Sequence, residues 1–224
     1  MEKAIVLLSG GLDSLVTAAV AATQCEELYF LHVSYGQRTQ ERELQSFAEI
    51  SRHYQPVQTK VLDWRWLAEM GGSRLTDASY QPVKSQKQQD FPDTYVPFRN
   101  ATLLCAAVAW AEVVQANRIY IGAVEEDSSG YPDCRKVFFE AMQKTIETGS
   151  GNNPPISIHT PVIDLHKSEI VALGMKLKAP FELSWSCYFA TDEACGMCDS
   201  CRLRLNAFSR AGFADPIKYS RNDI

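Results

Sequence analysis

Four of the seven cysteines lie between residues 187 and 201, and their spacing is typical of a metal site. The pattern Cys187-x7-Cys195-x2-Cys198-x2-Cys201 supplies four thiolates that can converge on one tetrahedral ion. Because four cysteines complete the coordination shell, we expect one structural Zn²⁺ ion per chain. A C-x2-C-x2-C run also opens ferredoxin-type signatures, so an iron–sulfur cluster is the alternative. The negative charge of such a centre could be offset by two nearby arginines, Arg202 and Arg204.

A second group of residues with chemical potential spans residues 9–14, Ser-Gly-Gly-Leu-Asp-Ser, between an apolar run and an apolar helical segment. Glycines let the backbone approach a phosphate, and the two serines add hydroxyl donors. The carboxylate of Asp13 fits beside phosphates if Mg²⁺ lies between them. The loop contains no lysine and matches neither common nucleotide-binding motif, which argues against an ordinary phosphoryl-transfer ATPase. A plain glycine turn is the alternative. The expected nucleotide-binding residues are Leu8, Ser9, Gly10, Gly11, Leu12, Asp13 and Ser14.

Alternating strands and helices must position both groups. A continuous apolar run predicts a buried strand at residues 4–8, and further strands are predicted at residues 28–33, 57–62, 118–123 and 156–159. Apolar or amphipathic stretches predict helices at residues 15–23, 42–54, 100–116, 136–147 and 167–177, with a terminal helix at 203–208. This alternation predicts a doubly wound, Rossmann-like α/β fold with a mostly parallel sheet. We expect an ATP-binding domain over residues 1–180, with a long loop at 71–97, and a small metal-binding module over 181–224. The polar loop is a candidate lid or a simple insertion.

Composition narrows the class of protein. The 224 residues are 46% hydrophobic and 22% charged, which is typical of a soluble globular chain with one main domain. The net charge of −5 argues against a protein that binds nucleic acid mainly through phosphates. The N-terminal apolar run is too short for a signal peptide, and no run approaches the length of a membrane span. We therefore expect a cytoplasmic protein with no membrane contact.

The combined motifs resemble the 7-cyano-7-deazaguanine synthase (QueC) family, and the glycine loop resembles the pyrophosphate loop of adenine-nucleotide α-hydrolases. The resemblance runs from residue 9 to residue 201. It includes the sequences at 35–38 (YGQR), 96–100 (VPFRN), 127–135 (DSSGYPDCR) and 185–188 (WSCY). It implies conversion of 7-carboxy-7-deazaguanine and ammonia to the corresponding nitrile. ATP would adenylate the carboxylate, ammonia would give an amide, and a second activation would remove its oxygen. A homodimer is also implied.

The remaining candidate residues follow the ends of the predicted strands, where ligands bind in parallel sheets. Four charged side chains are the expected catalytic residues: Arg38, Arg99, Asp133 and Lys167. Both arginines could bind a phosphate or a carboxylate. The alternatives are an ion pair of Arg38 with Glu41 or Glu43, a salt bridge for Arg99 and a solvated Lys167.

Four further residues are expected to contact ligands. Tyr35 and Gln37 are expected at the nucleotide, while Tyr131 could stack on the base. Asp127, like Asp133, could accept hydrogen bonds from a guanine-like N–H edge or hold Mg²⁺ through water. Their loop could instead simply cap a helix.

Two other function classes fit parts of the sequence. A related enzyme could use the same loop on another acceptor, as a tRNA thiolase or a small-molecule amide synthetase. The chain shows no basic appendage for tRNA, and an amide synthetase leaves the cysteine cluster unexplained. A zinc-knuckle nucleic-acid-binding module on an α/β scaffold is the non-enzymatic alternative, which the net negative charge argues against.

Overall fold

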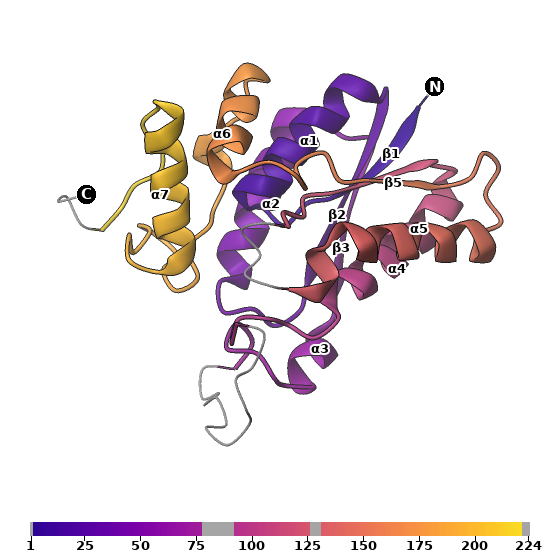
Figure 1. Cartoon of the computed structure of the whole chain (residues 1–224), viewed down its shortest axis with the longest axis horizontal. Helices are drawn as coiled ribbons and strands as arrows, with labels where there is room; N and C mark the ends of the chain where they lie inside the picture. The colour runs from indigo at the N-terminus through magenta and orange to yellow at the C-terminus, as the bar shows by residue number, and fades with distance from the viewer. Residues whose placement is uncertain (1, 78–91, 126–130, 221–224) are drawn as a thin grey trace.

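A parallel five-stranded sheet forms the centre of the protein in the computed structural model, which describes residues 2–77, 92–125 and 131–220 (Figure 1). The strands are β1 (Lys3–Leu7), β2 (Glu27–Ser34), β3 (Gln58–Asp63), β4 (Arg118–Ile121) and β5 (Ser157–His159). Their order in the sheet is β3-β2-β1-β4-β5, and every described pair is parallel. The chain therefore moves outward from β1 in both directions, which confirms the doubly wound fold.

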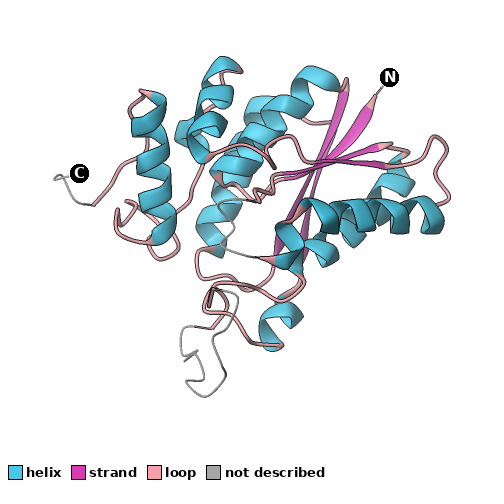
Figure 2. Cartoon of the chain, in the orientation of Figure 1, coloured by secondary structure: helices cyan, strands magenta, loops and turns pink. Residues whose placement is uncertain are grey.

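Helices cover both faces of this sheet (Figure 2). They are α1 (Leu12–Gln24), α2 (Gln40–Tyr54), α3 (Arg65–Glu69), α4 (Arg99–Val114), α5 (Lys136–Gly149), α6 (Lys167–Lys176) and α7 (Asp199–Ala211). Two single-turn 3-10 helices lie at Pro132–Cys134 and Phe181–Leu183. One hydrophobic cluster joins the sheet to α1, α2, α6 and α7, and a second joins it to α4 and α5.

The central strand has the burial expected of a strand covered on both faces. Residues 4–8 are all at most 6% exposed, and they alternate between the two hydrophobic clusters. The continuous apolar run that predicted this strand follows directly from this double burial.

Several element boundaries differ from the sequence-based expectation. Helix α1 begins at Leu12, directly after Gly11, and α7 begins at Asp199 rather than at residue 203. The early start of α7 has a local cause, because the Cys198 sulfur accepts a hydrogen bond from the Cys201 backbone N–H at the first turn. Helix α3 was not predicted, since five residues are too few to show a helical period.

The last helix packs against the main fold instead of standing apart from it. The rings of Phe181 and Phe208 meet edge to face with centroids 5.1 Å apart, and both belong to the cluster that contains β1 and α1. Residues 78–91, the centre of the predicted 71–97 loop, lie outside the described residues. The lid hypothesis concerns these residues and stays a prediction. The base of that loop is closed by Arg74, which donates its backbone N–H to Asp93 O at 2.8 Å.

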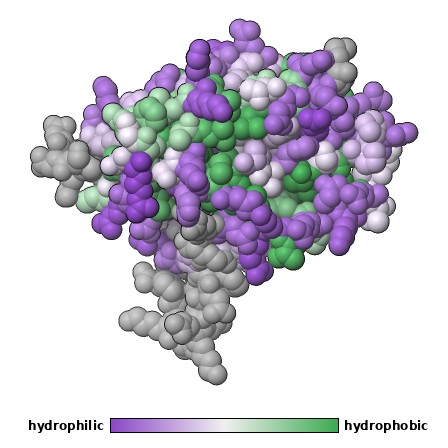
Figure 3. All heavy atoms as spheres, turned by 45° about the horizontal axis from the view of Figure 1, so that its top comes forward, coloured by the Kyte–Doolittle hydropathy of each residue, from purple (hydrophilic) through white to green (hydrophobic). Residues whose placement is uncertain are grey.

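The surface gives no sign of a membrane-spanning segment in the described part of the chain. None of its helices is both long enough and apolar enough to cross a bilayer. The face shown in Figure 3 mixes hydrophilic and hydrophobic residues.

Candidate active site

The carboxyl ends of β1, β2 and β4 meet at one edge of the sheet, where a pocket of about 310 Å³ opens. Ligands bind at this edge in doubly wound folds, because loops and helix N-termini converge there. Twelve of the predicted catalytic and ligand-binding residues line the pocket, apart from the metal-site cysteines: Leu8, Ser9, Gly11, Leu12, Asp13, Ser14, Tyr35, Gln37, Arg38, Arg99, Tyr131 and Lys167. Gly10 and Asp133 are not among the described residues that line it, and Asp127 lies outside the described residues.

The glycine loop is held by its own serines. The hydroxyls of Ser9 and Ser14 lie 3.0 Å apart, and Ser9 Oγ accepts from Gly11 N at 3.2 Å. The carboxylate of Asp13 accepts from Lys167 Nζ at 2.8 and 3.0 Å. Lysine is thus absent from the loop sequence but is delivered to it by the start of α6, 154 residues later.

Two glycines let other elements approach this loop closely. Gly10 has φ +91°, and a Cβ there would lie 2.9 Å from Glu43 O and from Ser46 Cβ. The sequence analysis assigned Gly10 to phosphate approach, which stays a prediction; in the structure the lack of a side chain at Gly10 lets α2 pack closely. Gly122 follows β4, and a Cβ there would lie 2.9 Å from the carbonyl of Asp13. Sequence reasoning missed Gly122, although its place directly after a strand was a usable signal.

Arg99 brings a partly buried positive charge to the pocket at the first residue of α4. Its Nη1 donates to the Tyr35 hydroxyl at 3.1 Å. Burial acts to lower the pKa of Arg99, but the neighbouring Tyr35, Cys134 and Asp133 outweigh it and raise the pKa, so the group stays charged. Burial raises the pKa of Tyr35. A cation at a helix N-terminus opposes the helix dipole, and an anion bound in the pocket would relieve this conflict.

Asp133 supports that helix rather than facing the pocket. Its side chain is buried and Oδ2 accepts from Asn100 N at 2.9 Å, while Asn100 Nδ2 donates to Asp133 O at 2.9 Å and to Cys134 Sγ at 3.2 Å. The 3-10 turn is thereby tied to the start of α4. The substrate contact that the sequence suggested for Asp133 finds no support in this geometry, because its carboxylate bonds α4 and is not among the residues that line the pocket.

Glu43 fixes the loop between β2 and α2. Its carboxylate accepts from Gln37 Nε2 and from Thr39 Oγ1, both at 2.9 Å, and Gln37 Oε1 accepts from Tyr35 N at 2.8 Å. Burial raises the pKa of Glu43 despite these bonds, which act to lower it. The ion pair between Arg38 and Glu43 that we considered from the sequence does not form.

Tyr131 lines the pocket beside the end of the long loop. Its hydroxyl lies 2.5 Å from Thr94 Oγ1, and its ring centroid lies 5.4 Å from that of Tyr95. Burial raises the pKa of Tyr131, so the phenol stays neutral. A partly buried aromatic face at this position is suited to packing against a planar ring.

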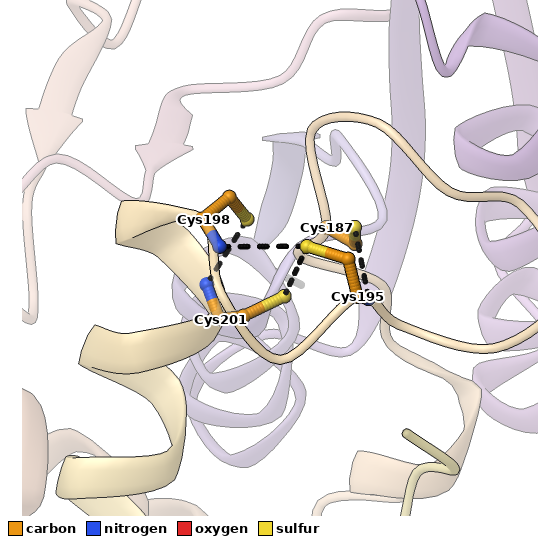
Figure 4. A group of neighbouring side chains, drawn as sticks. All are labelled: Cys187, Cys195, Cys198 and Cys201. Carbon is orange, nitrogen blue, oxygen red and sulfur yellow. Dashed lines mark hydrogen bonds between the residues drawn. The ribbon is translucent and has the colours of Figure 1, made fainter. Parts of the chain in front are cut away.

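The four predicted cysteines form one cluster, shown in Figure 4. Their sulfur atoms all lie within 4.8 Å of one another, and those of Cys195 and Cys201 are 3.9 Å apart. Two sulfurs bound to one tetrahedral zinc at ~2.3 Å each lie about 3.8 Å apart, so the donor set fits a zinc ion. Backbone N–H groups of Cys198 and Cys201 each donate to the preceding cysteine sulfur at 3.4 Å, which favours thiolates.

The cysteine segment also forms one wall of the pocket. The lining residues from this segment are Trp185, Ser186, Cys187, Tyr188 and Ser200. The sequence analysis singled out residues 185–188 but gave them no ligand-binding role, apart from Cys187 as a metal ligand. Arg204 does not serve mainly to offset the charge of the cluster as we expected. Its guanidinium is 1% exposed and pairs with Asp215 at 2.7 Å.

Fold and site together define a doubly wound α/β protein with a ligand pocket at the carboxyl edge of its parallel sheet. The fold resembles that of a 4-thiouridine synthetase solved in complex with RNA and bound ATP, with a TM-score of 0.50 and 14% identity over 94% of this chain and 50% of that one. It also resembles a predicted subunit of tRNA methyltransferase from Methanocaldococcus jannaschii, with a TM-score of 0.51 and 12% identity over 100% and 94% of the two chains.

Residues 3–212 match the family described as queuosine biosynthesis protein QueC. A 7-cyano-7-deazaguanine synthase from Chlorobium phaeobacteroides is 56% identical over 98% of this chain and 97% of its own length. One from Chlorobium chlorochromatii is 55% identical over 97% and 96% of the two chains. The chain belongs to the QueC family.

Proposed function

We propose that this chain converts 7-carboxy-7-deazaguanine and ammonia to 7-cyano-7-deazaguanine at the expense of ATP, for queuosine biosynthesis. The relatives that carry this activity in their names match nearly the whole chain. The observation that carries the proposal is one pocket that the glycine loop, Arg38, Arg99 and Lys167 line together with the aromatic residue Tyr131. Such a pocket can hold a polyphosphate, a carboxylate and a planar ring together.

The reaction needs the carboxylate oxygen to become a leaving group. The carboxylate attacks the α-phosphorus of ATP and releases pyrophosphate, and ammonia then displaces AMP to give the amide. The amide oxygen is activated in the same way by a second ATP, and loss of AMP and a proton gives the nitrile. Two passes at one site require a bound substrate that is protected from water.

We assign the residues by the groups they can reach. The N–H and hydroxyl groups of residues 9–14 bind the pyrophosphate portion of ATP, with Lys167 beside them, and Tyr35 and Gln37 shape the nucleotide side. Arg38 and Arg99 bind a phosphate or the substrate carboxylate. Tyr131 packs on the deazaguanine ring, while Asp133 positions α4. The sequence alone suggests that Asp127, which lies outside the described residues, accepts from the N–H edge of that ring.

Two metal ions fit this chain. Asp13 would hold Mg²⁺, which supplies charge neutralisation at the phosphates. Zn²⁺ held by the four cysteines would have a structural role, since no coordination position stays open. We further propose an ATP-binding unit over residues 1–180 and a metal-binding unit over 181–224. The enzyme would act on small molecules in the cytoplasm as a homodimer, without binding nucleic acid or a membrane directly.

Mass spectrometry of one reaction mixture tests this function. The protein is incubated with 7-carboxy-7-deazaguanine, ammonium, ATP and Mg²⁺, beside a Ser9→Ala/Asp13→Ala variant and a Ser209→Ala/Asp63→Ala control outside the pocket. We expect a nitrile that needs ATP, persists in the control and disappears in the loop variant. Amide alone would limit the activity to the first half of the reaction. Recovery of the acid with ATP intact would refute the proposal and favour another acceptor.

A further inference from the structure

Phe189 lies in the loop between Cys187 and Cys195, and its half-exposed ring meets two arginines from elsewhere in the chain. The Cζ atom of Arg38 lies 5.1 Å from the ring centroid, and that of Arg74 lies 5.9 Å from it. These arginines belong to two different segments, the β2–α2 loop and the base of the long loop. One ring of the cysteine module therefore contacts both.

A second aromatic side chain attaches the same segment to the site. The Trp185 ring centroid lies 4.5 Å from Arg42 Cζ, and Trp185 N donates to Gly10 O at 2.9 Å. Trp185 Nε1 also donates to Ala190 O at 3.1 Å, which closes the turn around Cys187. Cys187 thus lies midway between two aromatic residues that each pack on an arginine near the glycine loop.

The contact with Phe189 leaves Arg38 able to bind an anion. A guanidinium that stacks on an aromatic ring uses its face, and its N–H groups in the plane remain available. Within the described part of the chain, Arg38 forms no ion pair, whereas Arg74 pairs with Asp93 at 3.6 Å. Arg38 lines the pocket with an exposed side chain, and no carboxylate of the described residues pairs with it.

We propose that Phe189 is a positioning residue that holds the Arg38 guanidinium at the pocket wall for an anionic group of a substrate. The anion is a phosphate of ATP or the carboxylate of the deazaguanine acid, which present the same chemistry to the guanidinium. This inference rests on the proposed function only for the identity of those two ligands. It gives the cysteine module a part in substrate binding, because the loop that carries Phe189 is anchored at Cys187 and Cys195.

Calorimetric binding of ATP and of the acid, each measured alone, tests this role in Phe189→Leu and Phe189→Tyr. Leucine removes the ring, and we expect about two- to fivefold weaker binding of one ligand, because an exposed cation–π contact typically contributes that much. Tyrosine keeps the ring and should restore binding. Phe213→Leu is the matched control, since Phe213 is 41% exposed against 46% for Phe189. Metal content should stay at the wild-type level in all three.

A combined variant separates this inference from the proposed function. If Phe189 acts through Arg38, Phe189→Leu should weaken binding no further in an Arg38→Ala background. Equal losses in both backgrounds, or unchanged binding in Phe189→Leu while Arg38→Ala weakens it, would overturn the role of Phe189 and leave that of Arg38 intact. Unchanged binding in Arg38→Ala would overturn both. Loss of metal from Phe189→Leu would indicate a purely structural role and would also overturn the proposal.

Discussion

The pair of Arg204 and Asp215 should be the most costly electrostatic contact to break in the described structure. Both side chains are nearly inaccessible to solvent, at 1% and 3% exposure. Arg204 donates two hydrogen bonds to the Asp215 carboxylate, at 2.7 and 3.0 Å, and others to the Ser184 hydroxyl and to Phe181 O. Through these bonds Arg204 connects α7 both to the segment before Cys187 and to the segment that follows the helix.

Asp215→Asn keeps the size of the side chain and removes its charge. The Arg204 cation would then be buried without a counter-ion, and one side of the new amide would present N–H groups to existing donors, including the Tyr219 hydroxyl at 2.6 Å. Removal of one partner of a buried ion pair costs about 3–5 kcal/mol. For a chain of this size each kcal/mol lowers Tm by about 2–4 °C, so we expect a decrease of about 6–20 °C.

Thermal and urea unfolding followed by tryptophan fluorescence measure this cost, with metal content determined on the same samples. Asp63→Asn is the control, because its pair with Arg65 is 49% and 72% exposed and should contribute at most about 1 kcal/mol. If Asp215→Asn unfolds within about 1 kcal/mol of the wild type, the pair does not need its charge balance and the reasoning from burial is wrong.

Three further perturbations probe other parts of the molecule. Gly122→Ala should weaken ATP binding about tenfold or more in calorimetry, because its Cβ would meet the Asp13 backbone at 2.9 Å, whereas Gly149→Ala has nothing within 4 Å and should bind normally. Burial lowers the pKa of His32. The stability that this histidine contributes is therefore complete above pH 6.5 and is lost as pH falls through its folded-state pKa. In urea unfolding, His32→Asn should lack this part of the acid sensitivity, which is at most about 1.4 kcal/mol per pH unit. Cys195→Ser should lower metal content and Tm together, and a fully metal-loaded, equally stable variant would contradict the four-ligand site.

The centre of the sheet could be predicted from the sequence because its strands are rich in apolar residues. Residues 4–8 form a continuous apolar run, and residues 28–33 are apolar except for His32, as expected of strands covered on both faces. Helix α3 could not be predicted, because its five residues include one buried side chain, Leu67. The start of α7 was missed because cysteines at the helix N-terminus were interpreted only as ligands.

The members of the site could be predicted more readily than their contacts. Strand ends and helix starts showed that Arg38 and Arg99 belong at one edge of the sheet, and both line the pocket. Asp133 was assigned to the ligand because a carboxylate after a strand commonly faces one, but its carboxylate accepts a hydrogen bond from the backbone of Asn100 in α4. The contact of Arg38 with Phe189 joins residues about 150 positions apart, and no local pattern encodes such a pair.

The pair of Asp13 and Lys167 shows how a loop without lysine can still present one to a phosphate. Both side chains are partly exposed, at 27% and 19%, so their ion pair should contribute no more than about 1 kcal/mol. A contact of that strength holds the lysine over the loop and would yield readily to a more highly charged polyphosphate. The Asp13 carboxylate released in this exchange would then lie beside the phosphates, where it would hold the proposed Mg²⁺. One weak ion pair can therefore keep both groups in position before the nucleotide binds.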